Sequence, residues 1–512
     1  MVTRFVIRPV IAGLAVWLAV TPVLANGWEH WGVPLDILLA TLGAEEPGYR
    51  MRAARSLGVR QEPRAVAPML ARLADADERP LVKDAVMAAL GQIGDHRAVP
   101  ILTRVLKHDV RDELRAAAAA ALAGMAAAQA LPDLIAAYEG DRSLIVRAGV
   151  VEALGAFDDP SAISLLTGLL AADANPSLRR KAIRSLGLTR SPSVTVPLLA
   201  ALSRASGASE RGAIVEALGH IADPRALAGL AALYDRTRDN ALKVRLAVAL
   251  GAIRDGSAVP KLIELLQSDL AAVQFFAIEA LAEAGDERAA QPLRQLYRRA
   301  TVSSRTSLEL AKQGRPAAYL AEQSLRLEAI RVLASLDAAG SLAEFLDAAA
   351  VAMFDRSSGL GLRLNEGSYQ LRRMAIAGLG YSGALRATRF LLAGPIDDGD
   401  FRLRAAAARA LGVLGHDQAS DALAALLGDV SAEVRWVAAR VLGRLKRPAA
   451  GAGLVAALDD RHPEVRRQAV LSLGYLADPA ACERIAGLEQ GDPDEAVRNA
   501  ARATAGILCR GG

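Results

Sequence analysis

One sequence motif returns fourteen times along the 512-residue chain and constrains the fold more than any other feature. SLIVRAGVVEALGAFDDPSAISLLTGLL, from Ser143 to Leu170, is echoed by EVRRQAVLSLGYLADPAACERIAGL, from Glu464 to Leu488. The copies align on one position, usually basic: Arg50, Lys83, Arg115, Arg147, Arg179, Arg211, Lys243, Gln274, Arg326, Arg372, Arg404, Arg435, Arg466 and Arg498. Most steps are 31 to 33 residues, and self-similarity at such a period predicts a solenoid of stacked units.

Each repeat predicts two helices. In the helix that carries the aligned basic residue, apolar residues fall on one face, as at Val465, Ala469 and Leu473, and Gly474 is expected to end it. The first helix of the next unit is expected to open at an Asp that caps its N-terminus. These caps are Asp95, Asp159, Asp223, Asp255, Asp286, Asp417 and Asp478. Apolar residues make up 52% of the chain and aromatic residues only 4%, which indicates a helical core of Ala, Leu and Val.

A second regularity lies six residues before the aligned position. An Asp stands there in eight repeats: Asp77, Asp109, Asp141, Asp173, Asp398, Asp429, Asp460 and Asp492. Such an Asp is expected to accept backbone N–H groups at the start of the second helix and to meet an Arg of its own or the adjacent unit. Catalytic carboxylates are the alternative, but an active site is singular and these residues recur evenly. We therefore interpret them as a structural ladder of charge.

The motif resembles a known repeat. DANPSLRRKAIRSLG, from Asp173 to Gly187, and DRHPEVRRQAVLSLG, from Asp460 to Gly474, resemble short HEAT repeats of the phycobilin-lyase-like type. The resemblance covers residues 31–508 and implies a right-handed all-α solenoid of about fourteen helical hairpins. It also implies a non-catalytic scaffold or adaptor that binds a protein partner, and the alternative is a lyase-like or metal-assisted enzyme built on the same repeats.

The residues themselves do not predict catalysis. The chain has no His-Glu dipeptide of the kind that di-iron HEAT-like hydroxylases use as ligands, and its six histidines are scattered. It has no Walker loop, nucleophile elbow or zinc-type Cys/His spacing. We therefore predict no catalytic, cofactor-binding or metal-binding residue and no cofactor. The net charge of only +5, from 61 basic and 56 acidic residues, predicts no nucleic-acid partner.

The N-terminus predicts export. Arg4 and Arg8 precede an uncharged, largely apolar run from Val10 to Val20, and Val23-Leu24-Ala25 forms a plausible signal-peptidase site. Residues 1–25 are thus predicted to be a signal peptide and residues 26–512 the solenoid. The apolar run is shorter than the roughly 20 residues of a membrane span, so no stable span is expected after cleavage. The predicted location is the periplasm or the extracellular medium.

The two cysteines lie in the last repeat. Cys482 falls early in its first helix and Cys509 at the end of its second, so an antiparallel hairpin brings them to the same end. In an oxidising compartment they are able to form a disulfide, and two free thiols are the alternative.

Two features suggest a binding surface. The long steps of 52 and 46 residues place insertions near residues 300–323 and 355–368, the first extending its helices and the second forming a mobile glycine-containing loop. The two insertions are expected to lie side by side, and they either form one partner-binding lobe or are tolerated additions to the surface. The residue after the aligned position is expected to project from the solenoid. In the later repeats this gives five candidate partner-binding residues: Phe275, Leu327, Arg373, Trp436 and Arg467. For Trp436 the alternative is burial against a neighbouring unit.

Overall fold

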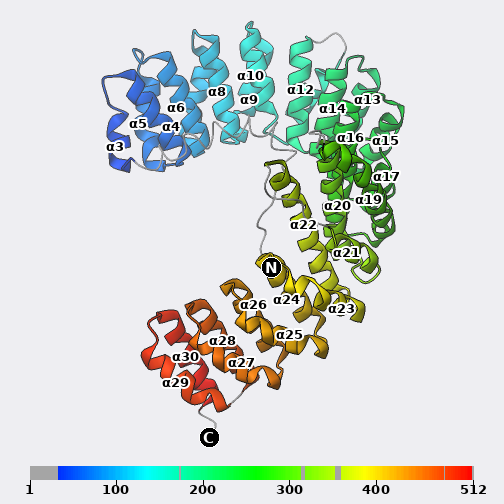
Figure 1. Ribbon diagram of the computed structural model, residues 1–512. Coiled ribbons are helices and arrows are strands. Elements are labelled where there is room, and N and C mark those ends of the chain that lie inside the picture. The colour runs from blue at the N-terminus through cyan, green and yellow to red at the C-terminus, as the bar shows by residue number, and fades with distance from the viewer. Residues whose placement is uncertain (1–32, 172–174, 313–316, 352–358, 478, 510–512) are drawn as a thin grey trace. The chain divides into compact units, whose positions relative to one another are not determined.

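The protein is built from stacked helical hairpins. The computed structural model describes residues 33–512 except 172–174, 313–316, 352–358, 478 and 510–512 (Figure 1). These residues form twenty-eight α-helices, α3 to α30, joined by short turns, many of them 3-10 helical, and contain no strand. Consecutive helices pair into fourteen antiparallel hairpins, which confirms the predicted all-α solenoid. The predicted signal peptide lies outside the described residues.

The chain divides into two compact units, each of seven hairpins. Unit 1 ends at Ile253. Its helices are α3 (Leu35–Thr41), α4 (Pro47–Val59), α5 (Val66–Ala74), α6 (Pro80–Ile93), α7 (Val99–His108), α8 (Asp112–Gly124), α9 (Leu131–Gly140), α10 (Leu144–Leu154), α11 (Pro160–Gly168), α12 (Pro176–Thr189), α13 (Thr195–Arg204), α14 (Ala208–Ile221), α15 (Leu227–Arg236) and α16 (Asn240–Ala252).

Unit 2 begins at Arg254. Its helices are α17 (Val259–Leu265), α18 (Ala271–Ala284), α19 (Ala290–Lys312), α20 (Ala317–Leu336), α21 (Leu342–Ala349), α22 (Gly359–Tyr381), α23 (Leu385–Ala393), α24 (Phe401–Leu414), α25 (Ser420–Ala425), α26 (Ala432–Leu445), α27 (Gly451–Ala456), α28 (Pro463–Leu476), α29 (Cys482–Gly491) and α30 (Glu495–Leu508). In both units the even-numbered helices are the second helices of their hairpins and carry the aligned basic position.

Second helices of successive hairpins pack on one another and form the core. Seven residues after the aligned position stands a leucine with no exposed surface in thirteen of the fourteen hairpins. They are Leu57, Leu90, Leu122, Leu154, Leu186, Leu218, Leu250, Leu281, Leu333, Leu379, Leu411, Leu442 and Leu473. Full burial of one leucine contributes about 1.5–3 kcal/mol, so the shared position supplies a hydrophobic seam through each stack.

The glycine after this leucine brings neighbouring second helices close together. A Cβ on Gly474 would lie 2.9 Å from the Thr504 side chain of α30, and one on Gly187 would lie 2.7 Å from the Cα of Ala217 in α14. The prediction that Gly474 ends its helix is therefore wrong, since α28 continues to Leu476 and ends at Ala477, whose backbone is left-handed at φ 54°. The glycine is required by packing and not by the turn.

The cap prediction for the first helices is confirmed at five positions. The side chains of Asp95, Asp159, Asp223, Asp255 and Asp286 each accept the backbone N–H two residues later. At Asp159 this N–H begins α11 directly, and at the other four it begins a 3-10 turn that leads into the helix. Asp417 is an exception because His416 occupies the cap position and Asp417 is paired with Arg447 instead. Asp478 lies outside the described residues.

The acidic ladder connects neighbouring hairpins, as predicted. Arg404, Arg435 and Arg466 each donate from Nε and Nη2 to the Asp of the following hairpin, with Nε–Oδ2 distances of 2.7, 2.5 and 2.7 Å. The partners are Asp429, Asp460 and Asp492, and Arg115–Asp141 in unit 1 repeats the geometry at 2.7 Å. Arg372 pairs with Asp398 in the same way through one nitrogen. Each bond crosses from one hairpin to the next and therefore fixes their register.

The ladder also has irregular positions. At the N-terminal end Arg50 binds Glu78 at 2.6 and 2.8 Å, so the assignment of Asp77 to this role is wrong by one residue. At the first insertion the buried Arg326 donates to the hydroxyl of Tyr297 at 3.0 Å, and that hydroxyl donates to Asp347 at 2.5 Å. Burial raises the pKa of Tyr297, so the phenol stays protonated and remains a donor. Asp173 lies outside the described residues.

The paired carboxylates predict a loss of stability in acid. Hydrogen bonds from Arg115 and Arg466 hold the pKa of Asp141 and Asp492 below the usual range. At Asp429 and Asp460 burial is the largest single influence and raises the pKa, but bonds from arginine and backbone N–H groups together lower it. Because these pKa values lie below the about 3.9 of an unfolded Asp, the unfolded chain takes up protons first.

We therefore expect these groups to contribute their full stability, independent of pH, above about pH 5, and we expect the free energy of unfolding to fall as the pH drops through about 4 toward the folded pKa values. Urea unfolding measured between pH 6 and pH 3 checks this. A variant with Asp429→Asn, Asp460→Asn and Asp492→Asn should be less stable at pH 6 and lose less on acidification. An equal acid dependence in both proteins would contradict the assignment.

The insertions lengthen helices. Residues 300–312 belong to α19 and 317–323 to α20, as expected for the first insertion. The second insertion was predicted as a mobile loop, and this is wrong for residues 359–368, which form the start of α22. Glycine costs about 1 kcal/mol in a helix interior, but the glycines of this segment are interspersed with the good helix formers Leu, Arg and Glu, and the helix is stabilised by packing further along α22.

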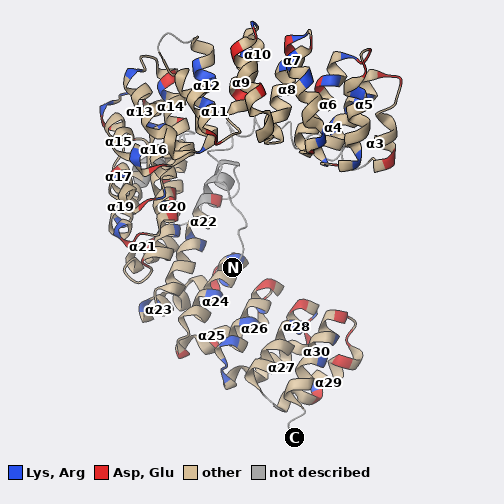
Figure 2. Ribbon diagram, turned by 180° about the vertical axis from the view of Figure 1, so that it is seen from behind, with Lys and Arg blue, Asp and Glu red and all other residues tan. Residues whose placement is uncertain are grey.

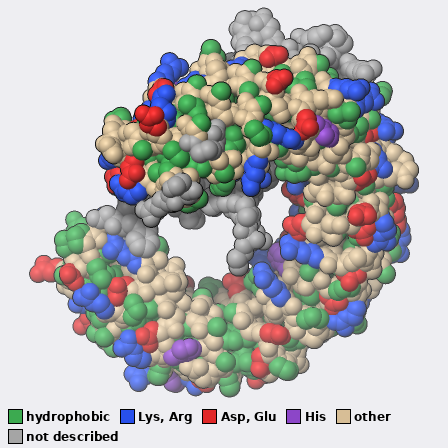
Figure 3. All heavy atoms as spheres, turned by 90° about the horizontal axis from the view of Figure 1, so that it is seen from below, with side chains coloured by type: hydrophobic (Ala, Val, Ile, Leu, Met, Phe, Trp, Pro, Cys, Tyr) green, Lys and Arg blue, Asp and Glu red, His purple; other side chains and the backbone are tan. Residues whose placement is uncertain are grey.

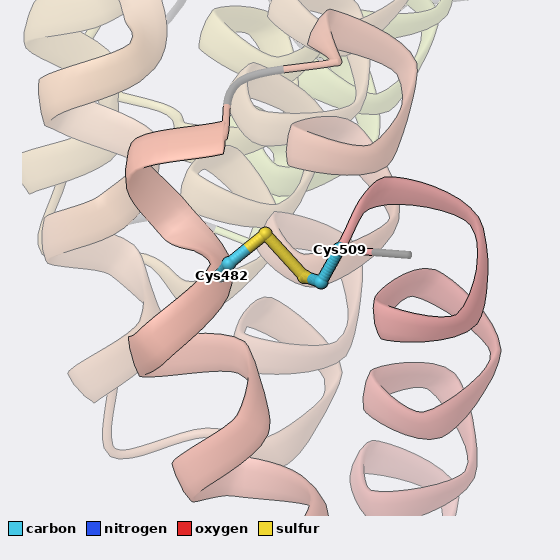
Figure 4. Close-up of a disulfide and its surroundings, with 2 residues drawn as sticks. All are labelled: Cys482 and Cys509. Carbon is cyan, nitrogen blue, oxygen red and sulfur yellow. A yellow bond between two sulfur atoms is a disulfide. The ribbon is translucent and has the colours of Figure 1, made fainter. Parts of the chain in front are cut away.

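A disulfide joins the two helices of the last hairpin (Figure 4). Cys482 in α29 and Cys509, the residue after α30, are bonded with their Cα atoms 5.8 Å apart. The bond closes a sequence separation of 27 residues at the C-terminal end of the array. Of the two alternatives for the cysteines, the structure has the bonded pair.

Candidate protein-interaction surface

The second helices of the last five hairpins carry a row of exposed apolar residues. α22, α24, α26, α28 and α30 pack side by side in unit 2. Nine residues after the aligned position, four of them expose a large apolar side chain: Tyr381 at 64%, Val413 at 53%, Tyr475 at 58% and Ile507 at 83%. We call these four residues the apolar row. A side chain that packs within the stack lies on the opposite face, so the row is free for another molecule.

On α26, which has no apolar residue in the row, arginines occupy this position and the turn before it. α26 has Arg444 at the same position and Arg440 one turn earlier, both exposed. Arg440 lies over the ring of Trp436, 5.4 Å from its centroid, and no carboxylate in the described part of the chain pairs with Arg440 or Arg444. On α24, Arg409 contacts Glu433 of α26 at 3.2 Å. The surface therefore combines apolar contact with cations that are available to a partner.

All five predicted partner-binding residues lie on second helices of unit 2, and all five are half-buried. Phe275 of α18 packs edge-on against Phe276, and Leu327 lies on α20. Arg373 of α22 donates to Gln370, Trp436 of α26 supports Arg440, and Arg467 of α28 pairs with Glu464 at 2.8 Å. Their role in binding stays a prediction.

In the structure, the most exposed positions lie further along each second helix than the predicted partner-binding position. In the helices of the five candidates, the residue after the aligned position is half-buried because it borders the packed seam of second helices, whereas the position eight residues later, two turns along the same face, is exposed in all five. Trp436, Arg440 and Arg444 illustrate this progression. The sequence contained part of the signal, since counting nine residues from the aligned positions of α22, α24, α28 and α30 returns Tyr381, Val413, Tyr475 and Ile507.

The surface carries side chains that are suited to a protein interface. Across the residues that the structure describes, no three His, Cys, Asp or Glu side chains gather closely enough to hold a metal ion. Basic and acidic side chains alternate over the face seen in Figure 3. Tyrosine and arginine are frequent anchors of protein interfaces because each supplies apolar contact together with a hydrogen-bonding group. No helix in the part of the chain that the structure covers has the length and hydropathy of a membrane span.

Solved structures share the fold. A chain from the structure of Kap95p with RanGDP superposes with a TM-score of 0.55 at 14% identity, over 94% of this chain and 72% of that one. Importin beta gives a TM-score of 0.46 at 12% identity, over 93% and 79%. The CpcE–CpcF phycocyanin lyase of Nostoc sp. PCC7120 gives 0.33 at 23% identity, over 49% and 94%. No curated protein sequence matches the chain.

Family membership follows from the repeats themselves. The family model for HEAT repeats matches residues 35–123, 111–176, 169–243, 236–311, 357–433 and 423–506. These matches leave out only the two ends and the region around the insertions. The chain belongs to the HEAT-repeat family.

Proposed function

We propose that the protein is an exported, non-catalytic scaffold that binds another protein through the apolar row and the arginines beside it. The observation that carries the proposal is the row itself, in which Tyr381, Val413, Tyr475 and Ile507 repeat at one position of adjacent second helices. Isolated exposed apolar residues are ordinary, but apolar residues that recur at one position of a regular scaffold, with an arginine between them, are typical of an interface. Kap95p, which shares the fold, is described as binding RanGDP.

Two further observations support export. The N-terminal residues have the order of charges, apolar residues and small residues of a signal peptide. The chain's two cysteines form a disulfide, and structural disulfides persist in oxidising compartments such as the periplasm. We infer a periplasmic or extracellular location. The extended helices α19, α20 and α22 at the insertions are proposed to contribute a second part of the binding surface.

The test is affinity co-purification from the native cell envelope with the full-length chain. A row variant carries Tyr381→Ser, Val413→Ser, Tyr475→Ser and Ile507→Ser. A control variant carries Leu81→Ser, Val110→Ser, Leu144→Ser and Val430→Ser, which removes four similarly exposed apolar side chains from the N-terminal ends of second helices and the turns before them. We expect a protein recovered with the wild type and the control to be lost, by at least tenfold, with the row variant.

Circular dichroism must show that both variants fold. Equal recovery with all three proteins would place the interface elsewhere on the chain. Recovery of no protein by the wild type would contradict the scaffold proposal.

A further inference from the structure

The ladder defines a carboxylate seat on each hairpin. We call a paired Arg and Asp of neighbouring hairpins a filled rung of the ladder. In a filled rung the guanidinium of the aligned Arg donates from Nε and Nη2 to the Asp of the next hairpin, as in Arg404–Asp429 at 2.7 and 2.8 Å. The Asp stands immediately after the first helix of its hairpin in extended backbone, for example with φ −79° and ψ 130° at Asp141. The seat is therefore an Arg side chain facing one position of known backbone geometry.

Two successive hairpins of unit 1 keep this geometry but lack the carboxylate. Ala205 and Thr237 occupy the positions that Asp holds elsewhere, six residues before Arg211 and Lys243. Their backbones are the same as at the filled rungs, with φ −64° and ψ 121° at Ala205 and φ −79° and ψ 142° at Thr237. Thr237 even keeps the capping bond, since its hydroxyl accepts the N–H of Asp239 at 3.2 Å. Only the acid is missing.

The arginines of these seats are left without their usual partner. Arg211 has no carboxylate contact within the described residues, and its Nε, which donates to Asp in the filled rungs, is buried without a hydrogen-bond acceptor. Arg179 approaches only Glu210, at 3.6 Å, against 2.5 to 2.7 Å for the Nε–Oδ2 bonds of the filled rungs. An unpaired buried donor costs roughly 1–3 kcal/mol, so a carboxylate from outside would recover free energy here.

The surroundings of the Arg179 seat favour an anion. Helix α12, which carries Arg179, contains four basic residues and no acidic residue (Figure 2). Of these, Arg180 and Arg184 are exposed on successive turns. The filled rungs elsewhere show that the seat is shaped for a carboxylate held by two parallel N–H bonds.

We propose that Arg179 and Arg211 form two adjacent vacant carboxylate seats that bind an acidic, extended peptide segment of a partner. Neighbouring second helices lie roughly 8–10 Å apart, and an extended chain advances about 3.3 Å per residue, so Asp side chains three residues apart match two successive seats. The site lies in unit 1, so it goes beyond the apolar row of unit 2 and does not depend on that proposal.

The test uses fluorescein-labelled peptides with the full-length protein. The probe is (Asp-Gly-Gly)4 and the matched peptide is (Asn-Gly-Gly)4, with binding followed by anisotropy at low ionic strength. We expect the Asp peptide to bind at least tenfold more tightly than the Asn peptide. Absence of binding, or equal binding of the two peptides, would overturn the proposal.

Asp substitutions at the two seats, compared with Asp substitutions elsewhere, distinguish binding at the seats from a general effect of charge. Ala205→Asp with Thr237→Asp restores the missing rungs, and should raise the urea midpoint and weaken the Asp peptide at least tenfold. Ser203→Asp with Ala232→Asp adds the same charge at exposed positions of α13 and α15 and should change binding less than threefold. Equal weakening by both pairs would overturn the proposal, and so would a twelve-residue thymidine oligonucleotide that binds more tightly than the Asp peptide, because phosphate would then be the preferred ligand.

Discussion

Replacing Asp460 by alanine is expected to lower the free energy of unfolding of unit 2 by about 3 kcal/mol or more. Arg435 and Asp460 expose only 7% and 8% of their side chains, and their two hydrogen bonds measure 2.5 and 2.9 Å. Removing one member of a buried pair leaves the other charge buried and unpaired, which typically costs about 3–5 kcal/mol. Asp460 also accepts the N–H of His462 at the start of α28, and that cap is lost as well.

The neighbouring residue supplies the control. Asp459 pairs with Arg484, but these side chains are 66% and 48% exposed. Exposed pairs contribute about 0–1 kcal/mol, so Asp459→Ala should lower the free energy of unfolding by less than about 1 kcal/mol. Urea unfolding at pH 7 measures both variants. Equal losses would show that the rung contributes no more than a surface ion pair.

A double variant shows whether the cost of Asp460→Ala comes from the lost ion pair or from leaving Arg435 buried without a partner. Arg435→Met together with Asp460→Ala removes both charges and leaves an apolar side chain in the seam. Replacing a buried ion pair by apolar groups is often nearly neutral, so the double variant should be more stable than Asp460→Ala alone. A double variant at least as unstable as the single one would mean that Arg435 is not the source of the cost.

Features that repeat could be predicted from the sequence, because each copy supports the others. The fourteen hairpins, the charged ladder and the caps at Asp95 and Asp159 all follow from one residue type at one position of the period. The partner of a residue cannot be predicted from one repeat, but it can be predicted when the same two residue types recur at the same positions in many repeats. The sequence predicted that ladder residues such as Arg404 and Asp429, 25 residues apart, form Arg–Asp pairs. It did not show whether the two partners belong to the same hairpin or to neighbouring hairpins.

Features that depend on packing between hairpins were missed. Gly474 resembles a helix terminator in sequence, yet α28 continues past it. The position is a glycine because the side chain of Thr504, on the next second helix, leaves no room for a Cβ. Arg50 binds Glu78 and not Asp77, since a longer side chain reaches the guanidinium from one residue further on. At the candidate surface, exposure was assigned two turns too early, because the packing that half-buries Trp436 is not visible in the sequence of one repeat.

The last hairpin provides the second large effect, which comes from the disulfide. Among the described residues, the last hairpin packs on the hairpin before it, with α30 against α28. Linking Cys482 to Cys509 restricts the unfolded chain over a separation of 27 residues. In the chain-entropy model a loop of this length stabilises the folded state by about 3–4 kcal/mol. The bond therefore adds to the packing of α30 on α28 in holding this hairpin closed.

We expect a variant with Cys482→Ser and Cys509→Ser to lose about 3–4 kcal/mol of the opening free energy of α29 and α30, with little change in the helices of unit 1. Native-state hydrogen exchange measures both in one experiment, and the wild type in reductant should match the variant. Unchanged protection in α30 would mean that packing on α28 alone holds the hairpin closed. A loss spread equally over α4 to α8 would instead show that the end of the array is not an independent opening unit. The predicted pattern, local loss at the bonded end, is the one expected if stability in a repeat protein passes only between neighbours.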